Sequence, residues 1–402
     1  MTNLPQGWKM ETLGEILSSD KYSIKRGPFE SALKKSFFVE KGIRIFEQYN
    51  PINNDPHWKR YFISHEKFQE LEAFKATEGD LLISCSGTLG KIVELPKDTE
   101  MGIINQALLK IRLNNIKILN SYFIYYFNSP IMQEKILEST LGSAIKNIAS
   151  VKILKQIEIP LPPLKEQERI VGILDESFAK IDESIKILEQ DLLNLDELMQ
   201  SALQKAFNPL KDNAKENYKL PQSWEWKSLE EISENISAGG DKPKNCTESK
   251  TAKNQIPVYA NGVNNNGLVG YTDKATIIKP SLTISARGTI GFVCIRKEPY
   301  FPIVRLISLI PCENILCLHY LYFCLNFFIA KGEGSSIPQL TIPKFKSLQI
   351  PLPPLKEQEQ IAEHLDFVFE KAKALKELYT KELKDYEELK QSLLNKAFKG
   401  EL

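Results

Sequence analysis

The stretch IPLPPLKEQE spans Ile159 to Glu168 and occurs again, unchanged, from Ile350 to Glu359. The two copies lie in a chain of 402 residues, which is long enough for two domains that each bury a core. Ten identical residues at this separation indicate an internal repeat, and such a repeat determines how the rest of the chain is divided.

The repeat extends well beyond these ten residues, and its parts follow the same order in both halves. The matching stretches are LPQGWKMETLGEI (4–16) with LPQSWEWKSLEEI (220–232), ISCSGTLG (83–90) with ISARGTIG (284–291), and LQKAF (203–207) with LNKAF (394–398). The segments between them differ in sequence and length. The chain is therefore interpreted as two copies of one fold that carry different inserts.

A long helix is predicted after each copy of the repeated stretch. The prolines stop helix formation before Leu164, and apolar residues then recur at steps of three and four over about 40 residues. The pattern is heptad-like in both copies. Its apolar positions are Leu174, Phe178, Ile181, Ile185, Leu188, Leu192, Leu195 and Met199 in the first helix, and Ile361, Leu365, Val368, Ala372, Leu375, Tyr379, Tyr386, Leu389 and Leu393 in the second.

The economical partner for each helix is the other copy, although a bundle or a homodimeric coiled coil is the alternative. The chain leaves the first insert at the start of one helix and enters the second insert at its end. The second helix must then begin where the first ends, so the pair is predicted to be antiparallel with a pseudo-two-fold axis.

The inserts are predicted to be mixed α/β domains. ISCSGTLGKIVEL (83–95) and LTISARGTIGFVCI (282–295) alternate like strands around a glycine turn, and TIIK (276–279) is expected to be a further strand. The segment 257–272 is rich in Asn and Gly and is expected to be an exposed loop. The predicted fold class is thus α/β (α+β): two mixed domains joined by two long antiparallel coiled-coil helices.

Charge is distributed unevenly although the net charge is only +1. Lys and Arg exceed Asp and Glu by 21 to 18 in residues 1–158 and by 17 to 12 in residues 208–349, whereas residues 159–207 and 350–402 are acidic. The longest apolar run, 320–330, is too short to cross a bilayer. We expect a cytoplasmic protein with reduced cysteines and no membrane partner.

Catalytic and metal-binding motifs are missing from the sequence. It contains no P-loop, no glycine-rich cofactor turn with a methyltransferase motif, and no HExxH or CxxC pattern. The sequence therefore favours recognition over catalysis, and it predicts no metal site and no cofactor on this chain.

The doubled IPLPPLKEQE before a long helix, the LPxxW opening of each half and the SGTLG and RGTIG turns resemble the specificity subunit of type I restriction-modification systems. The resemblance implies two target recognition domains, 1–158 and 208–349 with its linker, and two conserved helical segments, 159–207 and 350–402. It implies a non-catalytic chain that reads a bipartite sequence in double-stranded DNA. It also implies two DNA methyltransferase subunits and ATP-dependent restriction subunits as partners, with S-adenosylmethionine, ATP and Mg bound on those partners.

Candidate DNA-contacting residues are basic or amide side chains in the inserts, because Lys and Arg neutralise phosphates while Arg, Asn and Ser can read base edges. They are Lys25, Arg26, Lys59, Arg60 and Ser86 in the first domain, and Lys242, Lys244, Asn261, Asn264, Asn265 and Arg287 in the second. A solvated surface role is the alternative for each lysine and arginine, and a turn-forming role is the alternative for each asparagine.

Candidate partner-binding residues lie at the start of the two helices. They are Leu164, Ile170, Leu174, Leu355, Ile361 and Leu365. Packing between the two helices is the alternative for all six. A coiled-coil scaffold without a DNA role and a self-contained DNA-modifying enzyme remain as alternative functions, and the second lacks catalytic motifs.

Overall fold

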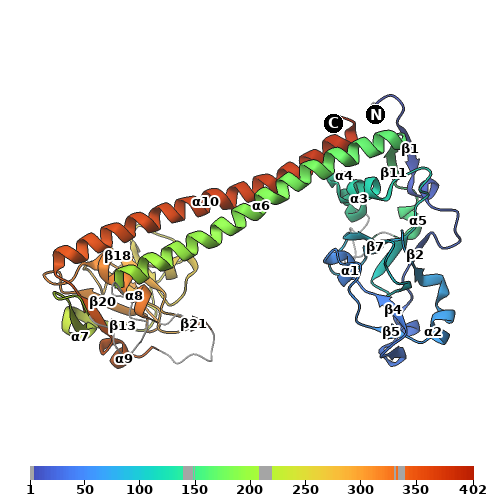
Figure 1. Cartoon of the computed structure of the whole chain (residues 1–402). Coiled ribbons are helices and arrows are strands. Elements are labelled where there is room, and N and C mark those ends of the chain that lie inside the picture. Colours follow the sequence, from blue (N-terminus) through green and yellow to red (C-terminus); the bar gives the residue numbers. More distant parts are fainter. Residues whose placement is uncertain (1–3, 139–147, 149, 208–219, 330–331, 334–339) are drawn as a thin grey trace. The chain divides into compact units, whose positions relative to one another are not determined.

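The computed structural model describes residues 4–138, 148, 150–207, 220–329, 332–333 and 340–402, and the linker within 208–219 lies outside them. The chain divides into two units (Figure 1). The first contains residues 1–188 and 381–402, and the second contains residues 189–380. Each unit therefore combines one insert with parts of both long helices.

The core of the first unit is an antiparallel sheet with strand order β2-β10-β7-β8. Its apolar face packs against the helices α3 and α4 and the ends of the long helices. A five-stranded sheet, β3-β5-β4-β9-β6, and a two-stranded sheet, β1-β11, complete the unit. The strands are β1 (Lys9–Thr12), β2 (Ile24–Arg26), β3 (Phe38–Val39), β4 (Ile43–Phe46), β5 (Phe62–Ile63), β6 (Lys75–Ala76), β7 (Leu81–Ser84), β8 (Ile92–Glu94), β9 (Gly102–Ile104), β10 (Leu108–Ile111) and β11 (Glu158–Leu161). The α-helices before the long helix are α1 (Tyr49–Ile52), α2 (His65–Glu70), α3 (Asn120–Asn128), α4 (Pro130–Glu138) and α5 (Val151–Leu154).

The second unit repeats the central sheet as β13-β20-β16-β18 and the small sheet as β12-β22, but its third sheet, β15-β14-β19, has three strands. As in the first unit, the sheet packs against the ends of the long helices, and here it also packs against the helix α8. The strands are β12 (Glu225–Ser228), β13 (Ser233–Ala238), β14 (Ile256–Tyr259), β15 (Leu268–Thr272), β16 (Ser281–Ile284), β17 (Thr289–Ile290), β18 (Val293–Arg296), β19 (Phe301–Pro302), β20 (Ile307–Pro311), β21 (Gly332–Glu333) and β22 (Gln349–Leu352). The short helices are α7 (Leu229–Ile232), α8 (Leu318–Phe328) and α9 (Ile342–Lys346).

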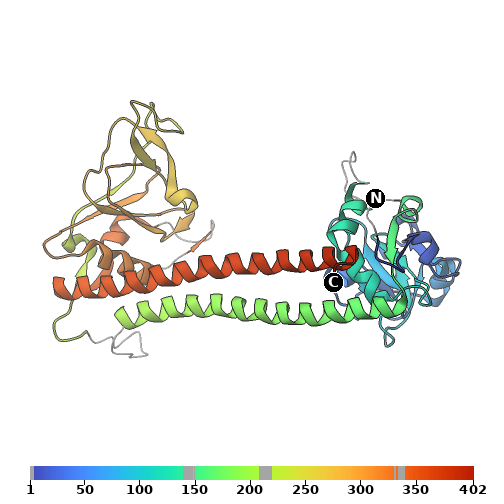
Figure 2. The same cartoon turned by 90° about the horizontal axis from the view of Figure 1, so that it is seen from above.

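The two long helices are α6 (Leu164–Phe207) and α10 (Leu355–Lys399), and they lie side by side in both views (Figures 1 and 2). Lys390 forms an ion pair with Asp182, and Lys376 forms one with Asp196. Partners advance fourteen residues along α6 while they retreat fourteen along α10, so the predicted antiparallel pairing is confirmed.

Some details of the sequence prediction are wrong. Leu375 and Leu389, predicted in the helix interface, are exposed, whereas the neighbouring Lys376 and Lys390 are half-buried there. A lysine can occupy such a position because its methylene stem packs while its ammonium group reaches an acid. The segment 257–272 contains β14 and β15 and not only a loop, and 276–279 forms a single bridge at Ile277 instead of a strand.

Each repeated stretch crosses a boundary between two elements. Its first residues lie in one strand of the two-stranded sheet, β11 or β22. Its KEQE residues lie at the start of α6 or α10. Strand β11 pairs with β1, and β22 pairs with β12 at the matching register. The boundary predicted at residue 158 therefore falls inside the first unit, because the strand it opens belongs to that unit's sheet.

Candidate nucleic-acid interface

Two equivalent glycine turns follow β7 and β16 and carry different side chains. Ser86 precedes Gly87 in the first unit, and Arg287 precedes Gly288 in the second. Both glycines have a left-handed backbone, with φ of 67° and 71°, and a Cβ added to either would meet no atom within 4 Å. Ser86 is half-buried and Arg287 is exposed. These turns thus leave open space at the glycine in which another molecule can approach the backbone closely.

Asn261 is tied into the second unit by both ends of its side-chain amide. Its Oδ1 accepts a hydrogen bond from the Ala286 backbone N–H at 2.8 Å, and its Nδ2 donates to the Val304 carbonyl at 2.6 Å. Asn261 thus connects the turn that carries Arg287 to the β19–β20 turn. Each end of the amide keeps one further hydrogen-bonding position, so the role in reading an adenine edge stays a prediction.

Asn264 and Asn265 are exposed in the short turn before β15, where Asn265 and Asn266 have positive φ values of 48° and 52°. Arg296 stabilises this turn, because its Nη2 donates to the Asn266 carbonyl at 2.6 Å. Its guanidinium lies 3.5 Å from the centre of the Tyr259 ring. The asparagines therefore serve as turn formers, and their side chains are also accessible.

The basic candidates of the first unit are partly engaged with neighbours. The ammonium group of Lys25 lies over the rings of Tyr22 and Phe74, and Arg26 donates to the Ile148 carbonyl at 3.5 Å. Lys59 is exposed and pairs with Glu100 at 3.1 Å.

Arg60 is also exposed, and its guanidinium lies over the Tyr61 ring. Lys242 and Lys244 in the second unit are exposed in the segment between β13 and β14. All the basic candidates except the half-buried Lys25 and Arg26 thus lie at the surface.

A buried charge network lies where β7 begins and β10 ends, at one end of the two inner strands of the central sheet, and it was not predicted from the sequence. Asp80 is fully buried and accepts two hydrogen bonds from Arg112, at 2.8 and 2.9 Å. These hydrogen bonds raise the pKa of Arg112 above its ordinary value. Burial lowers the pKa of the neighbouring Lys110, and Asp80 opposes that shift. The network fixes the end of β10 beside a shallow pocket, and it shows no periodic signal in the sequence.

The repeated stretch is fastened to its own domain by one buried glutamine in each half, another feature that the sequence analysis missed. Gln167 accepts from the Leu119 N–H at 2.9 Å and donates to the carbonyls of Lys117 and Pro162 at 3.0 and 2.9 Å. Gln358 makes the same three bonds, accepting from Cys317 N–H and donating to Ile315 and Pro353.

A buried tyrosine hydroxyl adds a fourth hydrogen bond at each site. Tyr122 donates to the Pro160 carbonyl at 2.8 Å, and Tyr320 donates to the Pro351 carbonyl at 2.6 Å. Gln167 and Gln358 are both fully buried. The identical sequence therefore serves the same physical task twice: it satisfies backbone groups that would otherwise be buried unpaired where a helix leaves its domain.

The six candidate partner-binding residues fall into two groups. Ile170, Leu174 and Leu365 are fully buried in the cores of their own units, so their side chains offer no surface to another chain. Leu164, Leu355 and Ile361 are half-buried. Packing within the chain accounts for the first group.

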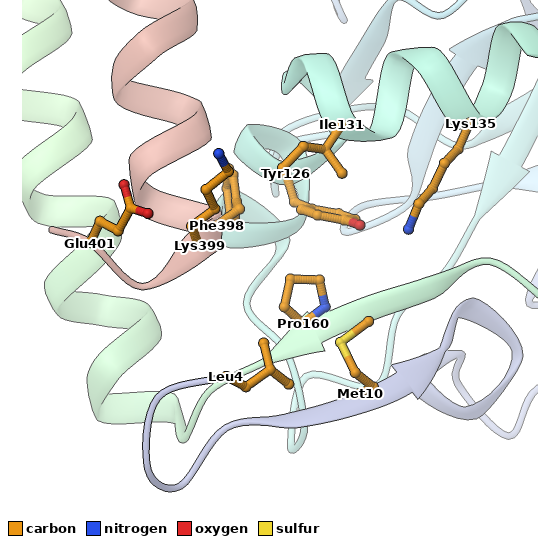
Figure 3. Close-up of a pocket in the computed structure, with 9 residues that line it drawn as sticks. All are labelled: Leu4, Met10, Tyr126, Ile131, Lys135, Pro160, Phe398, Lys399 and Glu401. Carbon is orange, nitrogen blue, oxygen red and sulfur yellow. The ribbon is translucent and has the colours of Figure 1, made fainter. Parts of the chain in front are cut away.

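A cavity of about 280 Å³ opens in the first unit between the end of α10, the β1–β11 sheet and α4 (Figure 3). We call this region, where the small sheet meets the long helices, the base of the unit. Met10, Tyr126 and Phe398 line the apolar part of the cavity, and Lys135 and Glu401 lie at its rim (Figure 3). In the second unit the place of Met10 is taken by Trp226, which packs against Phe328. The two units thus differ here in the side chain that occupies this register position.

Within the described residues, no group of three or more His, Cys, Asp or Glu side chains is placed to hold a metal ion. None of the described helices combines the length and the apolar character that a membrane crossing needs.

Comparison with known proteins assigns a class to a chain with two mixed α/β domains and two long helices. The family model for the type I restriction modification DNA specificity domain matches residues 5–192 and again 221–384. Because these two matches cover most of the chain, the protein belongs to this family of DNA specificity subunits, and the resemblance inferred from the sequence is confirmed.

Individual relatives agree with this assignment. A protein of Mycoplasma pneumoniae named as a type I specificity subunit is 33% identical over 221 residues, which are 54% of this chain and 56% of that protein. The chain thus matches little more than half the length of that relative. The specificity subunit of the type I restriction enzyme MjaVIII from Methanocaldococcus jannaschii is 25% identical over 81% of this chain and 79% of its own.

A solved structure supports the fold. A chain from a study of complex assembly and conformational transition in a type I restriction-modification system aligns over 100% of both chains with a TM-score of 0.80 and 21% identity. Two mixed α/β domains with paired long helices are therefore the architecture of this protein, and it shares this fold with that chain.

Proposed function

We propose that each unit of this chain reads one half of a split DNA sequence. The observation that carries this proposal is the pair of equivalent glycine turns, which share backbone geometry but differ in side chain, Ser86 against Arg287. A shared turn with exchanged side chains is what two readers of different bases need, because base edges are distinguished by the donors and acceptors that face them.

The exposed residues can be divided into those that would contact phosphates and those that would contact bases. Lys59, Arg60, Lys242 and Lys244 would neutralise phosphates and fix the orientation of the duplex, and Arg287, Asn264 and Asn265 would face base edges. Ser86 would read or merely tolerate a base in the other half-site. The modest net charge fits this role if partner chains share the phosphate contacts.

We further propose that the base of each unit and the outer face of the helices dock two DNA methyltransferase subunits, with ATP-dependent restriction subunits joining them. Leu164, Leu355 and Ile361 are the predicted helix residues that keep some accessible surface for this contact. S-adenosylmethionine, ATP and Mg would be bound by those partners, which perform the chemistry. Localisation in the cytoplasm follows from this role.

Co-expression with a candidate DNA methyltransferase subunit of the same class of system tests the proposal. We expect a complex of one chain with two methyltransferase subunits, and methylated adenines in one split, asymmetric sequence of the host DNA. A chain that purifies alone and directs no methylation would favour the alternative, a coiled-coil scaffold without a DNA role.

A further inference from the structure

The connection between β19 and β20 contains a strained stretch of backbone. Val304 and Arg305 are consecutive residues with left-handed backbones, φ 53° and 59°. Neither is a glycine, and a β-branched residue such as valine is disfavoured there. Both side chains are exposed, so no packing advantage of a buried side chain explains the conformation. Strain of this kind persists where the surrounding structure imposes it, often at a functional site.

Hydrogen bonds to two other segments hold this conformation. The Val304 N–H donates to the Gly240 carbonyl at 2.8 Å, and the Arg305 N–H donates to the Gly239 carbonyl at 2.9 Å. A Cβ on Gly239 would lie 2.6 Å from the Ile303 nitrogen, so the close approach requires glycine. The Asn261 amide adds its bond to the Val304 carbonyl.

The same Asn261 amide accepts from Ala286, the residue before Arg287. Arg305 and Arg287 are therefore carried on two turns that one side chain holds together. In the described part of the chain, the Arg305 guanidinium makes no hydrogen bond, ion pair or ring contact, and the residue is exposed. Its turn is fixed while its side chain is available to an outside partner.

The first unit has a turn at the matching register, but Gln106 and Ala107 in that turn are not left-handed and no arginine is present. In the first unit the Gly27 N–H donates to the Leu108 carbonyl, and the Leu108 N–H donates to the Asn105 carbonyl. In the second unit the Gly239 N–H donates in the same way to the Leu306 carbonyl, and the Leu306 N–H donates to the Ile303 carbonyl. This register places Ala107 at the position of Arg305. The two units thus differ at both linked turns: the first has Ser86 and Ala107 where the second has Arg287 and Arg305.

We propose that Arg305 contacts a base in the half-site of the second unit, beside Arg287, and that Asn261 positions its turn. The proposal rests on the function proposed above. Arginine pairs with the O6 and N7 acceptors of guanine in a bidentate manner, so the residue would select a guanine on either strand. Alanine at the equivalent position gives the first unit no such contact.

Methylation mapping with the assembled complex tests this role. The unmodified chain, Arg305→Ala and Arg305→Lys are each co-expressed with the methyltransferase subunit, and methylated adenines are located in the host DNA. Lys297→Ala is the matched control, because Lys297 is an exposed cation at the opposite end of the β16–β18 pair. Thermal unfolding of each variant checks that the fold is intact.

We expect both Arg305 variants to lose preference for one base position by about 5- to 150-fold, within one half of the motif only. Lysine restores charge but not the bidentate geometry, so it should not rescue the preference. An unchanged motif in both variants would overturn the proposal, as would a uniform loss rescued by lysine, which indicates a phosphate contact. If the unmodified chain directs no split motif, the proposed function itself fails.

Discussion

The Nζ atom of Lys390 in α10 lies 2.6 Å from the Oδ1 atom of Asp182 in α6. The same kind of pair, Lys376 with Asp196, recurs two heptads further on. Lysines thus stand at helix-interface positions that would suit leucine, and each needs an acidic partner on the other helix. This charge pattern favours the antiparallel register, because a shifted helix would lose the cross-helix acids of both half-buried ammonium groups.

Exchanging the two charges tests this register. Asp182→Lys alone and Lys390→Glu alone place like charges together, so each should lower the free energy of unfolding, whereas the combined exchange should recover most of the loss. Because Asp182 is largely exposed, we expect a coupling energy of no more than about 1 kcal/mol. A double-mutant cycle by urea unfolding measures it, and a coupling of zero would show that the pair contributes nothing to register.

The buried glutamines should be far more sensitive than the ion pairs. Gln167→Leu leaves one backbone N–H and two carbonyls without partners, so we expect a loss of about 2–5 kcal/mol in the free energy of unfolding. Gln358→Leu should behave alike in the second unit. Gln200→Leu, an exposed glutamine on α6, is the control and should change stability by less than about 0.5 kcal/mol. Equal small effects at all three positions would contradict the fastening role.

The cavity beside Met10 predicts a stabilising substitution. Met10→Trp copies Trp226, which occupies the matching register position in the second unit. The larger ring should fill part of the cavity and raise the free energy of unfolding by about 1 kcal/mol. Trp226→Met should have the opposite effect. Calorimetry measures both, and a destabilised Met10→Trp protein would show that the cavity cannot accept the ring.

Arg287 should determine preference in one half-site. Arg287→Ala is expected to weaken binding of duplexes through the second half-site alone, by about 1–3 kcal/mol, because a lost base contact affects only the bases it touches. Competition with duplexes altered in either half separates the two effects. Equal loss with both kinds of competitor would reduce Arg287 to a general electrostatic contact.

The two long helices and their antiparallel pairing could be predicted from the sequence, because a heptad pattern and the order of repeats leave few alternatives. The interface lysines could not, since Lys376 and Lys390 adjoin the leucines that fit the apolar pattern better. Only the partner acids on α6 reveal the register.

The functional residues were harder to predict than the fold. The roles of Gln167 and Asn261 depend on hydrogen bonds to distant backbone groups, which no local pattern encodes. For Gln167 the sequence did contain a signal, because this glutamine belongs to a stretch that is identical in both halves, and identical residues in two divergent domains suggest a shared structural role. Arg305 gives no sequence signal, since its importance rests on backbone strain and on the equivalence of two turns.

We propose that each unit reads its own half of a split DNA sequence, and an exchange of one unit tests this directly. The most direct measurement is to map methylated adenines before and after residues 8–161 are exchanged for the corresponding domain of a family member with another specificity. We expect one half of the motif to change and the other half to stay the same. A change in both halves, or no split motif in either protein, would contradict it.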